Sequence, residues 1–360
     1  MLGDRLRLAR KKAGLSMRDL AAIVSPKISA QAISKYERGE MMPSSSVLIG
    51  LGKSLGVSLD FLMGSQVHAL EAVEFRKHSG TSAKDRARAE ALLVEALEDY
   101  LTIEDVLDLQ PNNDPFGGVR FDEIGSFDEA EGAAADLRKA WRLGNNPIPS
   151  VTELLEERGI KVVREDLPPR FDGLTCRIMR GEEHPPAEAI VVSLHTTVER
   201  VRFNLAHELG HRVVLGCRAG TIDYEKAMHR FAAAFLVPAD HLRQEVGDRR
   251  HGITYHEIIG LKRSYGISAA AMLIRLRDTG LLPQGVVEHA FRTYARRWRT
   301  DEPEPIEEGQ GFGAFERPGR FQDLVWRALG EKLISPSRAA QFLKCSVDHV
   351  EREIRGPADQ

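Results

Sequence analysis

Apolar side chains recur every three or four positions along most of this chain, which is the spacing of a helix with one buried face. The clearest example lies near the middle of the sequence. Its apolar positions are Val198, Val201, Leu205, Leu209 and Val213. Thr196 and Glu199, three residues apart, form a predicted capping box at its beginning. We therefore predict a long helix over this stretch, with its apolar stripe buried.

The first sixty-odd residues show short helical patterns separated by serine and glycine. Ser16 and Ser29 are typical N-cap residues, and Gly14 and Gly39 are typical helix stops. The predicted helices are Asp4–Lys12, Met17–Val24, Ala30–Glu37, Ser44–Leu55 and Leu59–Met63. Their predicted core consists of Leu20, Ala21, Ile33, Leu48, Leu51, Leu55 and Leu62. The second and third helices, joined by a tight turn, predict a helix-turn-helix.

Charge indicates what this first segment binds. Residues 1–60 carry ten Lys and Arg against five Asp and Glu, a net charge of +5 in a chain whose total is −3. A basic surface attracts the phosphates of nucleic acid. On the third helix, Gln31 and Ala32 are predicted to face base edges. Ser34 and Lys35 suit phosphate contacts, and Arg38 completes the predicted DNA-binding set. The alternative is a helical bundle used only for protein contact or dimerisation.

A long, charged helix is predicted over Ser82–Leu109. The stretch Pro111–Gly118 then interrupts the helical pattern. We prefer to interpret this helix as a lever or dimerising element between two domains. An ordinary packing helix stays open as the second interpretation.

From Phe127 onward the pattern mixes helices and strands. The predicted helices are Asp128–Trp141, Val151–Arg158 and Asp223–Val237, and the predicted strands are Ile160–Val163, Gly173–Met179 and Ala189–Leu194. The strand just ahead of the long central helix is expected to offer an exposed edge to an extended peptide.

The last seventy residues consist of a basic stretch, an acidic, proline-rich stretch and a helical region. Arg292–Arg299 is basic, and the acidic, proline-rich stretch Asp301–Gly309 is a predicted linker. Helices over Phe321–Leu329 and Ser337–Glu353 are predicted to close the chain as a small docking bundle.

The chemistry-bearing motif lies on the long central helix. His207 and His211 are four residues apart, so one face of the helix presents both imidazoles a single turn apart. Two imidazoles so placed can bind one zinc ion at about 2.0–2.1 Å each. Glu208 lies at the flank, where a carboxylate can take a proton from water at the metal. The alternative is a buried helix that carries two histidines by chance.

A third ligand is expected on the helix Asp223–Val237. Glu225 lies near its beginning, and His229 follows four residues later on the same face. Two histidines and one glutamate leave a tetrahedral zinc with one open position, as in catalytic sites. We assign Glu225 as the ligand and His229 as the outer-shell residue that orients a ligand histidine. The reverse assignment stays open, and manganese or cobalt would also fit this ligand set.

The composition, 42% hydrophobic and 29% charged over 360 residues, is that of an ordinary protein with two or three domains. No apolar run reaches the roughly 18 residues of a membrane span, and the N-terminus lacks the apolar core of a signal peptide. Cys176, Cys217 and Cys345 are odd in number and far apart, which argues against a disulfide framework. We therefore expect a cytoplasmic protein that makes no membrane contact.

The first segment resembles a known family of DNA-binding domains. Ser34-Lys-Tyr-Glu-Arg-Gly39 followed by Pro43 resembles the phage-repressor-like (Cro/C1, XRE) helix-turn-helix family, and the resemblance covers residues 4–64. Val24–Ile28 makes the turn longer than is usual in that family. No DNA sequence preference is therefore carried over.

Residues 127–285 are similar to the ImmA/IrrE family of metallopeptidases. The stretch RFNLAHELGH, which ends at His211, resembles that family's R-F-T-L-A-H-E-L-G-H. The stretch EKAMHRFAA, which begins at Glu225, resembles its E-x-x-A-[NH]-x-F-A-A. Asn204 and Met228 depart from the two patterns. The segments Trp141–Ile148 and Leu261–Ser268 match as well.

This second resemblance implies a zincin fold and the cleavage of proteins, often a DNA-binding repressor encoded nearby. By residue match it supports His207, His211 and Glu225 as metal ligands and Glu208 as the general base. Peptide hydrolysis also needs a donor to the tetrahedral oxyanion. The candidates by residue type are Tyr224, His251, Tyr255 and His256.

Together these observations predict a multidomain, mainly α chain. Its predicted parts are an all-α helix-turn-helix domain over residues 1–66, a helical connector over 67–126, an α+β zincin-like metallopeptidase domain over 127–290, and a linker with a small helical region over 291–360.

The predicted function is a gluzincin-like zinc endopeptidase that binds double-stranded DNA, as a monomer or a homodimer. Its predicted substrate is a protein such as a transcriptional repressor, in a stress, prophage or toxin–antitoxin switch. One alternative is a transcription regulator whose peptidase-like domain acts as a sensor or binding platform without proteolysis. Another is self-cleavage that separates the two parts.

Overall fold

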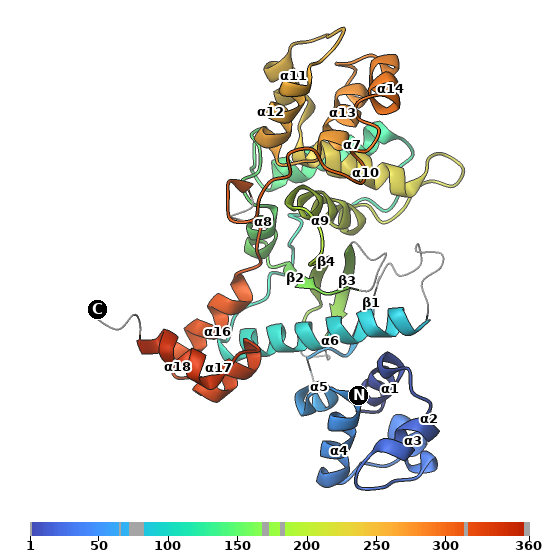
Figure 1. The fold of residues 1–360 in the computed structure, drawn as a ribbon, viewed down its shortest axis with the longest axis vertical. Coiled ribbons are helices and arrows are strands. Elements are labelled where there is room, and N and C mark those ends of the chain that lie inside the picture. Colours follow the sequence, from blue (N-terminus) through green and yellow to red (C-terminus); the bar gives the residue numbers. More distant parts are fainter. Residues whose placement is uncertain are drawn as a thin grey trace.

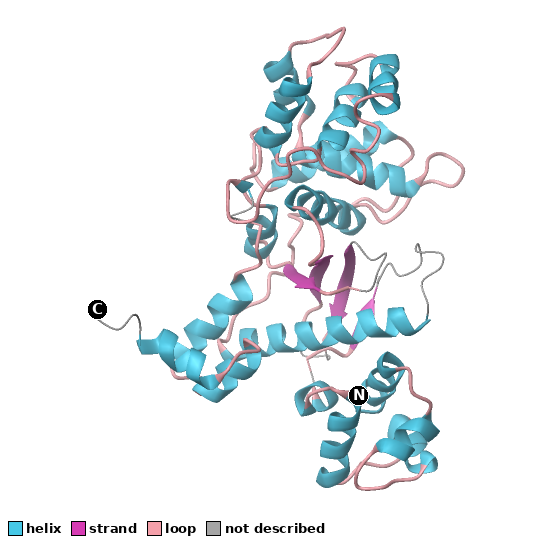
Figure 2. Ribbon diagram, viewed as in Figure 1, coloured by secondary structure: helices cyan, strands magenta, loops and turns pink. Residues whose placement is uncertain are grey.

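The computed structural model describes residues 2–64, 66–71, 83–167, 173–180, 184–312 and 316–355. That part of the chain contains seventeen helices and one four-stranded sheet (Figure 2). The prediction of a mainly α, multidomain protein with a small α+β part is confirmed. None of the described helices is both long enough and apolar enough to span a membrane.

The N-terminal region is a bundle of five short helices. They are α1 (Leu2–Ala13), α2 (Met17–Ile23), α3 (Ala30–Glu37), α4 (Ser45–Leu55) and α5 (Leu59–Met63). Serine hydroxyls at Ser16, Ser29 and Ser58 accept backbone N–H hydrogen bonds at the starts of α2, α3 and α5. These caps explain why the predicted starts of α2, α3 and α5 are confirmed, and the other predicted boundaries in this region agree to within two residues.

Helix α6 (Ala83–Val106) lies between this bundle and the sheet (Figure 1). Its buried leucines Leu93, Leu97 and Leu101 share one apolar core with α1, α5 and one face of the sheet. Tyr100 and Ile103 belong to a second core, formed with the C-terminal helices. These contacts are those of a packing helix, and a dimerising role stays a prediction.

The sheet has the order β1-β3-β4-β2, with β1 (Ala69–Glu71), β2 (Lys161–Glu165), β3 (Gly173–Met179) and β4 (Ala187–Ser193). β3 pairs antiparallel with both β1 and β4, and β2 pairs parallel with β4. Three of these strands are predicted by the sequence, and β1 is not. The expectation of an exposed edge on the strand ahead of the central helix is wrong, because that strand is β4 and it is paired on both sides.

The remaining helices lie on the other side of the sheet (Figure 1). They are α7 (Phe127–Ala140), α8 (Val151–Glu157), α9 (Val198–Val213), α10 (Tyr224–Leu236), α11 (Ala239–Val246), α12 (Tyr255–Tyr265), α13 (Ala269–Asp278) and α14 (Gln284–Arg292). Of these, α8 and α9 contact the strands and the others pack beyond them. Alternation along β4 divides its side chains, so Ile190 and Val192 share a core with α9 while Ala189 and Val191 share the core that contains α6.

Helix α9 is the predicted central helix, and its apolar stripe is buried as expected. The predicted capping box is wrong. The N-cap is Thr197, whose hydroxyl accepts a hydrogen bond from the backbone N–H of Arg200. Glu199 is buried instead and pairs with Lys262 of α12.

The C-terminal region is a bundle of three helices, α16 (Arg320–Gly330), α17 (Pro336–Phe342) and α18 (Val347–Arg355), that packs along α6 (Figure 1). The single helix predicted over Ser337–Glu353 is wrong. The chain turns between α17 and α18, where Lys344 has a positive φ of 51° and Ser346 accepts a hydrogen bond from the backbone N–H of His349.

Candidate metal centre and nucleic-acid interface

Two neighbouring helices bring three metal-ligating side chains together. His207 and His211 lie one turn apart on α9, and Glu225 lies in the first turn of α10. Nε2 of His207 is 3.1 Å from Nε2 of His211 and 3.3 Å from one carboxylate oxygen of Glu225, and the other oxygen is 3.6 Å from Nε2 of His211. A tetrahedral ion with ligands at about 2.0–2.1 Å requires ligand–ligand separations of about 3.3 Å. The three side chains therefore fit a zinc-sized ion.

His229 lies beside this cluster rather than in it. Among the described residues, the group of ligand atoms within 4.8 Å of one another consists of His207, His211 and Glu225. The His229 ring packs against His207, with centroids 4.7 Å apart, and stacks on Phe203 at 5.9 Å. Burial in this packing lowers the pKa of His229, and repulsion from the neighbouring His207 lowers it further. The Nδ1 atom of His207 has no hydrogen-bond partner within the described ranges, so the contact seen is ring packing, and the outer-shell role of His229 stays a prediction.

Glu208 is buried and faces the sheet. A Cβ atom placed on Gly173, the first residue of β3, would lie 3.5 Å from Cγ and 3.6 Å from Oε1 of Glu208. Any side chain at position 173 would therefore touch this carboxylate. The glycine keeps the backbone of β3 directly beside the candidate general base.

The C-terminal half of α9 is fixed to the sheet by a buried ion pair that the sequence does not predict. Nε of Arg212 donates to one oxygen of Glu188 on β4 at 2.7 Å, and Nη2 donates to the other at 3.0 Å. Such a two-point contact sets the direction of α9. It also sets the position of His211, the preceding residue.

The N-terminal half of α9 is fixed by two further buried pairs. Lys262 of α12 pairs with Glu199, and Arg202 pairs with Glu316 from the segment that precedes α16. All four side chains are at most 2% exposed. Lys262 also contacts Glu302 at 3.1 Å, so the acidic stretch Asp301–Gly309 is fastened to the helices around the site.

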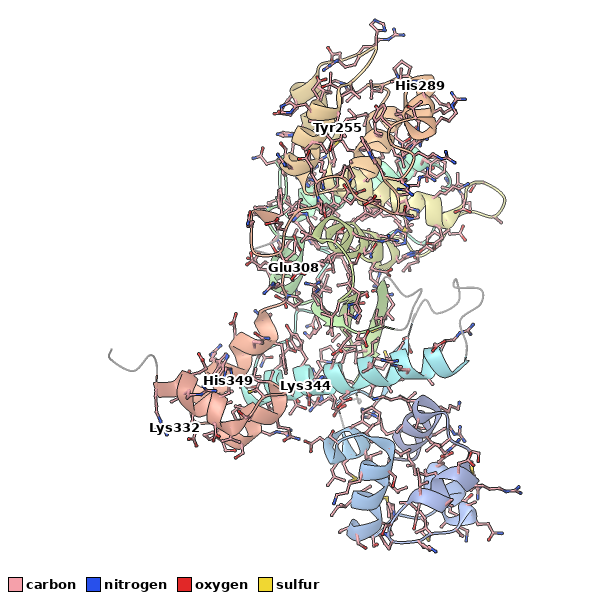
Figure 3. The ribbon with its side chains drawn as sticks, viewed as in Figure 1. Tyr255, His289, Glu308, Lys332, Lys344 and His349 are labelled. Carbon is pink, nitrogen blue, oxygen red and sulfur yellow. The ribbon has the colours of Figure 1, made fainter. Side chains whose placement is uncertain are left out.

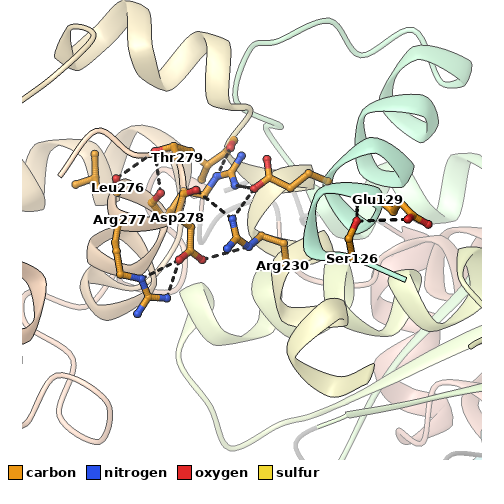
Figure 4. Close-up of polar contacts among 10 residues, drawn as sticks. Ser126, Glu129, Arg230, Leu276, Arg277, Asp278 and Thr279 are labelled. Atoms are coloured by element: carbon orange, nitrogen blue, oxygen red, sulfur yellow. Dashed lines mark hydrogen bonds and ion pairs between the residues drawn. The ribbon is translucent and has the colours of Figure 1, made fainter. Parts of the chain in front are cut away.

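Helix α10 is held by charged side chains on its far side (Figure 4). Arg230 donates to Glu131 of α7 at 2.8 Å and lies 3.3 Å from Asp278 of α13. Arg275 donates to the same glutamate at 2.6 Å. Burial alone would raise the pKa of Glu131, but the hydrogen bonds from the two arginines hold it below its usual value. This network fixes α10, and with it Glu225.

Of the four residues considered as oxyanion donors, Tyr224 is the one in contact with a ligand histidine. Its ring lies 5.0 Å from that of His211, and its hydroxyl donates to the carbonyl of Val214 at 2.6 Å. Tyr255, labelled in Figure 3, lies at the start of α12, and its hydroxyl donates to Glu304 at 3.1 Å. His251 and His256 are exposed.

The predicted DNA-contacting side chains lie along one helix. Gln31, Lys35 and Arg38 are exposed, and Ala32 and Ser34 are partly exposed. Arg38 donates to Glu40 at 2.9 Å and also to the hydroxyl of Ser34. Phosphate would have to compete with this carboxylate for Arg38. Base and phosphate contacts on α3 stay predictions.

Fold and site together define a two-part protein, with a basic helix-turn-helix bundle and an α+β domain of the metallopeptidase type. Comparison with family models agrees. Residues 6–62 match the helix-turn-helix model, and residues 155–277 match the model of the IrrE N-terminal-like domain, a peptidase family. The chain thus joins an XRE-type DNA-binding domain to an ImmA/IrrE-like peptidase domain, as the two resemblances imply. Comparison with curated proteins and comparison with solved structures each find no match.

Proposed function

We propose that this chain is a cytoplasmic, zinc-dependent endopeptidase that also binds double-stranded DNA. Its substrate is a regulatory protein such as a transcriptional repressor, within a stress, prophage or toxin–antitoxin switch. The observation that carries the proposal is the convergence of His207, His211 and Glu225 within 4.8 Å, with a buried Glu208 on the same helix. Ligand histidines and an adjacent carboxylate are the groups that metal-assisted peptide hydrolysis needs.

Each residue has a separate part in this reaction. His207, His211 and Glu225 would hold the zinc ion, which when bound would supply Lewis acidity toward the peptide carbonyl and toward water. Glu208 accepts a proton from the water that attacks the carbonyl carbon. As the C–N bond breaks, Glu208 returns that proton to the leaving amine nitrogen. Gly173 places the backbone of β3 beside this carboxylate, where a side chain would contact it.

The substitution Glu208→Gln tests the proposal. The variant should keep its zinc and lose cleavage by roughly 10²–10⁴-fold, which is the usual contribution of a general base. The protein is loaded with zinc and incubated with the product of the neighbouring gene. Fragments are followed by mass spectrometry and bound zinc by elemental analysis. Glu153→Gln, on the exposed face of α8, is the matched control. If the Glu208→Gln variant cleaves as fast as the parent, the peptidase proposal is refuted.

A regulator without proteolysis is the second candidate. It is supported by the apolar core that the helix-turn-helix shares with α6 and the sheet, because such a core can pass a change from one part to the other. Under this alternative, zinc changes DNA affinity equally in the parent and in Glu208→Gln, and no fragments form from any protein, including the chain itself.

DNA binding is tested by its dependence on salt. Affinity for duplex DNA from the chain's own locus should fall steeply as salt rises, since phosphate contacts release counterions. Lys35→Ala should reduce the slope of log affinity against log salt by about one. Lys53→Ala, exposed on α4, serves as the control. A flat salt dependence would favour a protein-contact module, and the size of the complex shows whether a homodimer binds.

A further inference from the structure

The strand β1 does not come from the sequence of the peptidase domain. It follows the helix-turn-helix directly, yet it pairs with β3 at the edge of the peptidase sheet. The register joins Ala69 to Met179, Leu70 to Ile178 and Glu71 to Arg177. The backbone N–H of His68 adds a hydrogen bond of 2.8 Å to the carbonyl of Met179. A segment linked to the DNA-binding domain therefore occupies part of this edge.

The other end of the same strand lies at the candidate active site. β3 begins at Gly173, beside Glu208, and reaches Arg177 four residues later. At about 3.4 Å per residue this separation is about 14 Å. A peptide that pairs antiparallel with β3 beside Glu208 runs in the same direction as β1. Its N-terminal side therefore meets Glu71 after about four residues.

A buried ion pair fixes the backbone just before β1. Glu98 of α6 accepts hydrogen bonds from the backbone N–H groups of Gln66 at 2.8 Å and Val67 at 3.1 Å. Arg5 of α1 donates to the same carboxylate at 2.6 Å and to the carbonyl of Val67 at 2.8 Å. Both charged side chains are 6% exposed. The helix-turn-helix thus holds this backbone through its own first helix.

Further contacts on either side hold the same stretch of backbone before β1. The side chain of Gln66 donates to Asp105 at 2.6 Å and accepts from Arg180, the residue after β3, at 2.6 Å. A Cβ atom on Gly64 would lie 2.5 Å from Cδ of Glu98. There is no room for even a methyl group between the end of α5 and this carboxylate.

We propose that β1 is a displaceable strand that fills part of the substrate-binding edge of the peptidase sheet, and that the docked DNA-binding domain holds it there through Arg5 and Glu98. When the domain is docked, a peptide can pair only with the part of β3 nearest Glu208, which has no strand partner on this side among the described residues. When the domain moves, β1 is released and the whole edge accepts substrate. Substrate binding at this edge rests on the proposed peptidase function, whereas the coupling of β1 to the DNA-binding domain does not.

Hydrogen exchange in the metal-free, full-length chain tests the coupling. Arg5→Ala and Glu98→Gln should speed exchange roughly tenfold or more in β1 and in the Arg177–Met179 stretch, because their shared hydrogen bonds open locally. Arg7→Ala, exposed on α1, and Glu95→Gln, one turn earlier on α6, are the matched controls.

Exchange in the central strand β4 separates release of one strand from a general loosening. The proposal is supported if β4 keeps the protection of the parent while β1 loses it. It is overturned if β1 exchanges as in the parent, or if β1 and β4 change together. Gly64→Ala, which adds only a methyl group against Glu98, provides a second variant should Arg5→Ala fail to fold.

Cleavage gives an independent readout of the occupied edge. If the parent cuts its substrate in a Glu208-dependent way, Glu98→Gln and Gly64→Ala should raise the rate by roughly tenfold, in step with exchange. Unchanged cleavage with fast exchange would show that β1 does not restrict substrate. Because exchange needs neither zinc nor substrate, failure of the peptidase proposal leaves the test of the coupling intact.

Discussion

Replacing Glu316 by alanine should destabilise this protein far more than a surface substitution. The carboxylate of Glu316 accepts hydrogen bonds from the backbone N–H groups of Val151 at 2.8 Å and Thr152 at 3.1 Å, and from the Thr152 hydroxyl at 2.8 Å. It also pairs with Arg202, which is fully buried at the start of α9. Removing one partner of a buried pair typically costs about 3–5 kcal/mol, because the other charge is left uncompensated.

The remaining contacts of Arg202 set the expected value within that range. Its guanidinium also donates to the carbonyls of Ile148 at 2.6 Å, Pro149 at 3.1 Å and Tyr265 at 3.3 Å. These neutral acceptors bind the two terminal nitrogens of Arg202 but do not neutralise its charge, and its Nε has no hydrogen-bond partner among the described residues. We therefore expect a loss of about 3 kcal/mol, at the lower end of the range.

Thermal unfolding followed by circular dichroism measures this loss. In a domain of this size each kcal/mol lowers Tm by roughly 2–4 °C, so Glu316→Ala should lower it by about 6–12 °C. Glu308→Ala is the matched control, since Glu308 also pairs with arginine but its side chain is 46% exposed. That variant should lose no more than about 1 kcal/mol. If the two substitutions lower Tm equally, the argument from burial is refuted.

Five other substitutions have expected outcomes. Loss of a residue that only orients a metal ligand typically weakens metal binding by roughly 10–100-fold. His229→Phe should weaken zinc binding within that range, and Glu225→Ala should weaken it by more. Competition with a chromophoric chelator measures both affinities. Burial raises the pKa of Glu156 to about 7, so its ionised form opposes folding above that pH. Glu156→Gln should stabilise the protein at pH 8 by up to about 3 kcal/mol in urea unfolding, and the gain should vanish below about pH 4.5, where the unfolded carboxyl is also protonated. Gly210→Ala should destabilise by about 1–3 kcal/mol in the same assay, because its Cβ would lie 2.9 Å from Phe231. Gly132→Ala, on an exposed helical face with nothing within 4 Å, should not destabilise.

Helices were predictable where the sequence marks their ends. Ser29 and Gly39 bracket α3, and its bounds are those predicted. The start of α9 misled the prediction because Thr196 and Thr197 are both suitable caps. The chain uses the second, since Glu199 is needed inside to pair with Lys262. A local pattern cannot show that a distant lysine will be buried.

Strand β1 and the buried pairs around α9 were not predictable either. Ala69–Glu71 is three residues long, too short for alternation to stand out. Glu188 and Arg212, like Arg202 and Glu316, are brought together only by the folded chain.

The sequence predicts those parts of the candidate site that lie on one helix better than the parts that two helices bring together. His207 and His211 share one helix, so their spacing alone places them together. Glu225 is on another helix, and the periodicity of that helix offers His229 on the same face. The choice between them depends on how α9 and α10 cross, where Gly210 allows Phe231 to approach closely. The structure brings Glu225 to the histidines.

The position of α6 bears on how such a fusion can evolve. Its leucines complete a core with the helix-turn-helix on one side and the peptidase sheet on the other. A recombination that removed the contacts of the DNA-binding part would expose its side of this core, at a cost of about 1.5–3 kcal/mol for each large apolar side chain left facing water. A new DNA-binding part would therefore need an apolar surface that fits α6, and we expect the two parts to be inherited as a matched pair.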